Sequence, residues 1–184
     1  MKRLAALGAF LLLTSCAHIS TKPEAPNEYR QLTQATPLPA ALDRAFQFRK
    51  TKLFLLGDVP GAKVQTGLFR GGPRDPAVGF EGSYRLFGAV TSLDQRQRFG
   101  HYFDFFWRAK RDAKITVRLE YRQANLRAFT QAREVDYPHA RGSHKTSFAV
   151  IGDDFWNDGH IIAWRCLLIE NGRIVAEDRS YLWR

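Results

Sequence analysis

An alternating stretch in the second half of the chain, Ile115–Arg122, most strongly limits the folds open to it. Apolar and polar residues take turns there with a period of two. Successive side chains of a β-strand point to opposite faces of its sheet, so the pattern predicts an antiparallel strand with one buried face. The residues expected in the core are Ile115, Val117, Leu119 and Tyr121, and those expected outside are Thr116, Arg118, Glu120 and Arg122.

Other short apolar segments flank this stretch and are separated by glycine, proline or asparagine. The last two are joined by Asn171-Gly172, a pair that favours the tight turn of a β-hairpin. The segments expected to form strands are 84–92, 101–108, 115–122, 128–137, 145–151, 161–169 and 173–183. This succession resembles an immunoglobulin-like or fibronectin-type fold, which implies an antiparallel β-sandwich over residues 84–184. A small antiparallel barrel is the alternative architecture.

Residues 39–83 are expected to form an N-terminal segment that packs on this body. The spacing of Leu42, Ala45 and Phe46 predicts a short helix within residues 39–49. Residues 52–56 predict a strand that ends at the turn-forming residues 57–61, and residues 64–70 are expected to pair back with it. Residues 71–76 are expected to form a loop. The fold class predicted for the whole chain is therefore mainly β.

The N-terminus has the features of a secretory signal. Lys2 and Arg3 precede the apolar run 4–13, which is too short to span a bilayer as a helix. The following Leu13-Thr14-Ser15-Cys16 resembles the lipobox of bacterial lipoproteins. The resemblance implies that signal peptidase II removes residues 1–15 and that Cys16 carries the lipid. Residues 16–38 then form a flexible tether, and Ala17 after the cysteine implies an outer membrane lipoprotein that faces the periplasm.

The chain is strongly basic, with 28 Lys and Arg against 18 Asp and Glu and a formal net charge of +10. Such a charge favours contact with anionic lipids or acidic glycans of the envelope. Nucleic acid is not an expected partner of a secreted, anchored chain. Arg108, Arg118 and Arg122 form a candidate stripe for an anionic ligand, and cross-strand ion pairs are the alternative explanation.

One acidic segment stands out in this basic chain. We consider it a candidate ligand-binding loop, made of Asp153, Asp154, Phe155, Trp156, Asn157 and Asp158. Aromatic rings beside carboxylates suit a sugar, whereas the alternative is that Phe155 and Trp156 fold under to cover the core. The spacing does not fit a calcium-binding EF-hand, and the scattered histidines do not have the spacing of metal ligands. The sequence therefore predicts no metal site and no cofactor.

Cysteine usage and the absence of catalytic motifs complete the sequence-based prediction. With Cys16 acylated, Cys166 has no partner for an intrachain disulfide, and its apolar neighbours predict that it is buried. Ser143 and His144 are adjacent in the chain, which is the wrong geometry for a nucleophile and its base. We expect a lipid-anchored, non-catalytic binding or structural module that contacts an envelope protein or polymer. The alternative is an envelope glycan-binding or hydrolytic domain that uses the segment 153–158.

Overall fold

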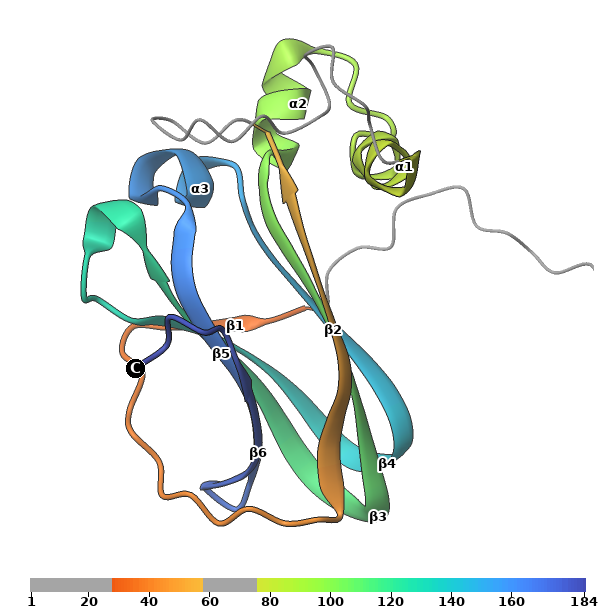
Figure 1. The fold of residues 1–184 in the computed structure, drawn as a ribbon, viewed down its shortest axis with the longest axis vertical. Coiled ribbons are helices and arrows are strands. Elements are labelled where there is room, and N and C mark those ends of the chain that lie inside the picture. Colours follow the sequence, from red (N-terminus) through yellow and green to blue (C-terminus); the bar gives the residue numbers. More distant parts are fainter. Residues whose placement is uncertain (1–27, 58–75) are drawn as a thin grey trace, which may run out of the picture.

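The computed structural model describes residues 28–57 and 76–184, and Figure 1 shows their arrangement. The elements in chain order are β1 (Arg30–Leu32), β2 (Phe46–Leu56), α1 (Pro76–Arg85), α2 (Ser92–Arg98), β3 (Gly100–Gln123), the 3₁₀ helix η1 (Ala124–Leu126), β4 (Gln131–Ile151), α3 (Asp153–Asp158), β5 (Ile161–Glu170) and β6 (Arg173–Arg179). All strand pairs are antiparallel. The prediction of a mainly β, antiparallel fold is confirmed.

The strands of the described residues form one six-stranded sheet in the order β1-β4-β3-β5-β6, with β2 joined to β3 outside this path. Strand β3 is its spine. One edge of β3 pairs with β4 along most of its length. The other edge is shared, because β2 pairs with residues 100–109 and β5 pairs with residues 116–123. The strands β2 and β5 therefore pair with the same edge of β3, β2 along its N-terminal half and β5 along its C-terminal half. Because one sheet contains all six strands, the immunoglobulin-like arrangement of two sheets is not confirmed.

Four of the expected strands prove to be halves of two long ones. The segments 101–108 and 115–122 both belong to β3, which has 24 residues, and the segments 128–137 and 145–151 both fall largely within β4. The register shifts between Ala109 and Ile115, where the alternation of the sequence fails. Pro138 of β4 is exposed and lies opposite this irregularity. Proline has no N–H group for the strand ladder, and it is tolerated here because the regular pairing is interrupted.

Two local predictions are wrong. Residues 39–49 do not form a helix, because β2 begins at Phe46 and the preceding backbone bonds to β6. The N–H groups of Ala41 and Asp43 donate to Ile174 and Val175 at 2.8 and 2.9 Å. These long-range bonds override the local spacing. Residues 84–92 do not form a strand either, since they contain the end of α1 and a turn into α2.

The start of α2 explains the second of these errors. Thr91 accepts a hydrogen bond from the backbone of Asp94, whose carboxylate accepts one from the backbone of Thr91. This reciprocal pair satisfies free N–H groups at the helix start. The expected pairing of residues 64–70 and the loop up to residue 75 lie outside the described residues. The signal, the lipobox and most of the tether lie outside them too.

The core lies on the inner face of the curved sheet. The residues expected there from the alternation of Ile115–Arg122 are all fully buried, as are Phe103, Phe105 and Trp107 at the other end of β3. The ring of Phe105 lies 5.6 Å from that of Trp164 on β5, which ties the two branches of the sheet together. Cys166 is buried as predicted, and burial raises the pKa of its thiol. The core is thus mainly aromatic and aliphatic.

The hairpin between β5 and β6 is also confirmed. Asn171 and Gly172 have φ angles of +50° and +71°, the left-handed conformations that a two-residue hairpin turn requires. Within the described residues, no helix has the length and apolar character needed to cross a membrane.

Candidate binding groove and predicted site residues

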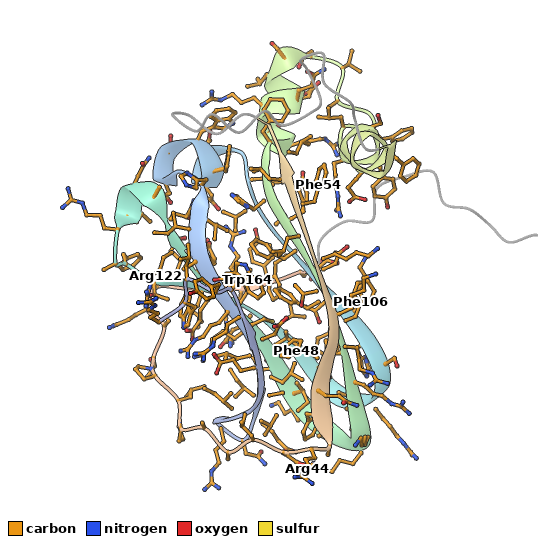
Figure 2. All side chains as sticks on the ribbon, in the orientation of Figure 1. Arg44, Phe48, Phe54, Phe106, Arg122 and Trp164 are labelled. Carbon is orange, nitrogen blue, oxygen red and sulfur yellow. The ribbon has the colours of Figure 1, made fainter. Side chains whose placement is uncertain are left out.

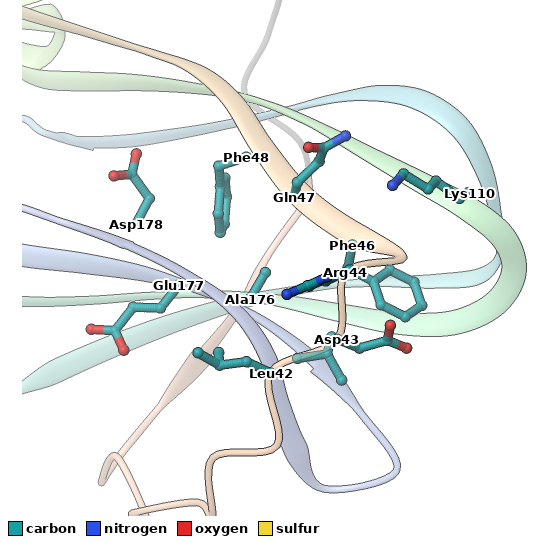
Figure 3. Close-up of a pocket in the computed structure, with 11 residues that line it drawn as sticks. Leu42, Asp43, Arg44, Phe46, Gln47, Phe48, Lys110, Ala176, Glu177 and Asp178 are labelled. Carbon is teal, nitrogen blue, oxygen red and sulfur yellow. The ribbon is translucent and has the colours of Figure 1, made fainter.

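The two branches of the sheet leave an open seam between β2 and β6. These strands are not paired in the sheet, although the hydroxyl of Thr51 on β2 donates to the carboxylate of Asp178 on β6. Figure 2 shows Phe48 and Trp164 between the two branches. On one side of the Thr51–Asp178 contact lies a groove of about 840 Å³, which we call the seam groove (Figure 3). It is lined by Leu42, Asp43, Arg44, Phe46, Gln47, Phe48, Lys110, Val175, Ala176, Glu177 and Asp178.

The floor of the seam groove is apolar. Phe46, Val175 and Ala176 are buried beneath it. Phe48 is half-buried and points from β2 into the space between the strands (Figure 3). Its ring makes an edge-to-face contact with Phe105, with centroids 6.1 Å apart. The groove therefore offers fixed aromatic surface to a ligand.

The rim of the seam groove carries charges of both signs. Asp43 is fixed there, because it accepts bonds from the backbone of Ala45 at 2.8 Å and from Arg111 at 3.1 Å. These two contacts, the backbone bond foremost, lower the pKa of Asp43. Arg111 also binds Glu170 at 2.6 Å through both oxygens and covers the ring of Phe46. Arg44 and Glu177 remain exposed at the rim, so the groove can pair with either charge.

A second hollow, of about 360 Å³, lies on the other side of the seam between β2 and β5. Its lining is nearly all apolar and includes Leu53, Phe54, Ile162 and Trp164. Its polar members include His101, which the sequence places on the inner face of β3. The backbone N–H of Ile161 donates to Nε2 of His101 at 3.1 Å. Burial lowers the pKa of His101 to about 4, so the ring is neutral at pH 7.

The low pKa of His101 predicts a pH-dependent stability. Between pH 6.5 and 4 the unfolded chain binds a proton at this residue and the folded chain does not, so stability falls as the pH falls. The shift corresponds to about 3 kcal/mol lost between pH 7 and pH 4. Urea unfolding of the wild type and His101→Gln across this range measures the loss. His101→Gln is expected to flatten the curve and exposed His139→Gln to leave it unchanged; equal slopes in all three proteins would refute the assignment.

The structure does not bring the predicted basic stripe together. Arg108 is exposed in the first half of β3, opposite Ser143 of β4, whereas Arg118 is buried farther along β3. Arg118 binds Glu134 at 2.6 Å and lies 3.5 Å from Glu120. Arg122 lies over the ring of Trp183 instead. The alternative of cross-strand ion pairs therefore describes Arg118, and the expectation that Arg118 and Glu120 face solvent is wrong.

The acidic segment is a short helix, α3, instead of a loop. Two of its three carboxylates, those of Asp154 and Asp158, accept bonds from side chains of β4. Asp154 accepts from Arg133, which is almost completely buried and whose Nε has no bonding partner among the described residues. Asp158 accepts from Gln131 at 3.3 Å. The helix therefore closes one end of the core.

The remaining residues of this segment lie as follows. Phe155 is buried against His101, with ring centroids 5.8 Å apart, which fits the alternative that it covers the core. Trp156 is half-buried and donates from Nε1 to the carbonyl of Arg96. Asp153 and Asn157 are exposed. The six residues thus do not converge on one surface.

Sequence reasoning missed the seam groove because its residues come from opposite ends of the domain. The spacing of Leu42, Ala45 and Phe46 predicts a helix, and nothing local places Phe46 or Phe48 beside residues 175–178. Among the described residues, no group of three or more potential ligands could hold a metal ion. No protein-family model matches this chain, and neither the curated proteins nor the solved structures yielded a match.

Proposed function

We propose that this chain is a lipid-anchored protein of the bacterial envelope whose β domain is a non-catalytic binding module. The observation that carries this proposal is the seam groove. It lies between two strands that approach each other without pairing, and its apolar floor is bordered by charges. Its volume is in the range of pockets that hold ligands.

The chemistry of the seam groove favours an extended segment of another envelope protein. A strand with an unpaired edge presents backbone N–H and C=O groups that can bind an added strand. Among the described residues, the edge of β2 that faces away from β3 pairs with no strand, so it offers such groups beside Phe48, which can contact apolar side chains of the partner. Arg44 and Glu177 are placed to pair with charged side chains on either side.

The proposed anchor fits the position of the domain in the chain. Glu28, where the described structure begins, follows Cys16 by 12 residues. A flexible chain of that length has an r.m.s. reach of about 20 Å, enough to hold the domain close to the membrane surface. Lipid on Cys16 would keep the module at the outer membrane on the periplasmic side.

The surroundings of polar residues also support a binding role over a catalytic one. His144, next to Ser143 in the chain, stacks on the ring of Trp107 with centroids 4.5 Å apart. The carboxylates of Asp154 and Asp158 bond to side chains of the domain. Each of these groups has a structural contact in place of a partner for proton transfer.

Site-specific photo-crosslinking in intact envelopes tests the proposed groove. A photoreactive residue in place of Arg44, at the rim, is expected to give one discrete adduct. The matched control is the same residue in place of exposed Asn157 on α3, which is expected to give none. Adding Phe48→Asp should lower the Arg44 adduct by about tenfold, because it places a charge on the apolar floor. Equal adducts from both positions, or no effect of Phe48→Asp, would contradict the proposal.

A further inference from the structure

A cationic surface lies on the outer face of the sheet, opposite to the face that carries Phe48 and Thr51, and it adjoins the seam groove at Gln47, which pairs with Arg108. Strand pairing puts Lys50 on β2 and Lys145 on β4 on either side of Phe106 on β3. Lys52 and Arg108 occupy the neighbouring rows of the same face, because opposed residues of antiparallel strands share a face. We call Lys50, Lys52, Phe106, Arg108 and Lys145 the basic face.

The charge of the basic face is largely unbalanced. Lys145 lies 3.7 Å from Asp104, which also lies 3.7 Å from Arg85. Lys50, Lys52 and Arg108 are exposed, and none of them forms an ion pair with a carboxylate in the described part of the chain. The nitrogen of Lys52 lies 5.8 Å from the ring centre of Phe106. Three cations thus face solvent within a few residues of one another on adjacent strands.

Helix α1 ends beside the basic face, since its last residue, Arg85, lies 3.7 Å from Asp104, which pairs with Lys52. Leu86 and Phe99 pack on Leu56, Tyr102 and Ala149 at the end of the sheet that the helices cover (Figure 1). The same two-helix unit exposes four large apolar side chains. These are Phe80, Phe87, Val90 and Leu93, which are 49% to 85% exposed. Apolar side chains of this size gain free energy when they leave water.

We infer that the basic face and the exposed apolar side chains of α1 and α2 form a docking surface for an anionic lipid bilayer. Basic residues near an anionic membrane are attracted to its surface, and adjacent apolar residues can enter the region below the headgroups. An acidic glycan would pair with the lysines and arginine but would leave Phe87 and Leu93 in water. The inference does not depend on the lipid at Cys16, although a lipid and a basic patch together bind more firmly than either alone.

A fluorescent label at residue 93 tests this inference. Leu93→Cys is introduced into the full chain with Cys16→Ser, so that the introduced thiol is exposed, Cys166 stays buried, and no lipid is attached. The labelled chain is mixed with phosphatidylcholine vesicles with or without phosphatidylglycerol. We expect the label to shift to shorter wavelength, and to be quenched by a lipid-borne quencher, only with phosphatidylglycerol.

Charge reversal supplies the matched comparison. Lys50→Glu, Lys52→Glu and Arg108→Glu together should weaken this response about 100-fold, since each cation near an anionic surface contributes about fivefold. Arg127→Glu, Arg173→Glu and Arg179→Glu together change the net charge equally at exposed sites elsewhere and should have a much smaller effect. Thermal unfolding of both proteins verifies that they fold.

Three results would overturn the inference. The first is an equal response to neutral and anionic vesicles, and the second is an equal loss in the two triple variants. The third is binding of an acidic polysaccharide through Lys50, Lys52 and Arg108 while the label at residue 93 shows no contact with lipid. That result would identify a glycan as the partner of the basic face.

Discussion

Replacing Gly100 with alanine is expected to destabilise the domain by about 3 kcal/mol or more. Gly100 begins β3 and pairs with Leu56 on one side and Ile151 on the other. Its φ angle is +144°, and an added Cβ would lie 2.2 Å from the carbonyl oxygen of Val150 and 2.8 Å from Cα of Ile151. Both contacts are with backbone, so the strands must move apart to admit the methyl group.

Gly142→Ala is the matched control for this variant. Gly142 also has a positive φ, +90°, but an added Cβ there would meet nothing within 4 Å. Gly142→Ala should lower the free energy of unfolding by only about 1 to 2 kcal/mol, the strain of an alanine at a positive φ. Urea unfolding followed by tryptophan fluorescence measures both variants. If Gly100→Ala costs no more than Gly142→Ala, the close approach of β3 and β4 at this point is not as described.

Cys16→Ser is expected to have the largest effect on location. The serine cannot form the thioether that would hold the proposed diacylglycerol, and a protein needs two or three acyl chains to bind stably to a membrane. The amount of protein in the outer membrane fraction should fall about tenfold or more relative to the wild type. Because Cys16 precedes the described domain, the thermal unfolding of this domain should not change.

Ala17→Ser provides the control for this substitution, since it alters the neighbouring residue and keeps the thiol. It should leave the outer membrane fraction unchanged. Membrane fractionation followed by immunoblotting measures all three proteins. A Cys16→Ser protein that stays in the outer membrane fraction at the wild-type level would show that another part of the chain holds it there.

Local patterns in the sequence predicted much of the core and one complete turn. The alternation of Ile115–Arg122 correctly identified Ile115, Val117, Leu119 and Tyr121 as core residues, because a period of two directly reflects strand geometry. The pair Asn171-Gly172 correctly identified the hairpin, because few other residues adopt its conformations. Both signals depend only on neighbouring residues.

The errors arose where distant residues decide the structure. The spacing of residues 39–49 suits a helix, but backbone bonds from Ala41 and Asp43 to β6 hold this segment extended. Alternation alone placed Arg118 on the solvent side of β3. In the fold, the N-terminal segment covers Arg118, which donates a hydrogen bond to the carbonyl of Thr36 at 3.1 Å. Whether a residue is covered in this way depends on which segments meet after folding.

The candidate surfaces could not be predicted for the same reason. The seam groove requires Phe48 to face residues 175–178, and the basic face requires Lys50 to lie in register with Phe106 and Lys145. These residues are separated by tens of positions in the chain. Only the register of the strands brings these residues together. The long strand β3 sets this register, and the sequence pattern predicted two shorter strands in its place.

The proposal that this module acts at the membrane is tested most directly by the intact mass of the protein isolated from envelopes. The account predicts a chain that begins at Cys16 and carries the added mass of a diacylglycerol, with or without a further acyl chain. A mature chain that begins elsewhere, or one that begins at Cys16 without added lipid mass, would contradict it.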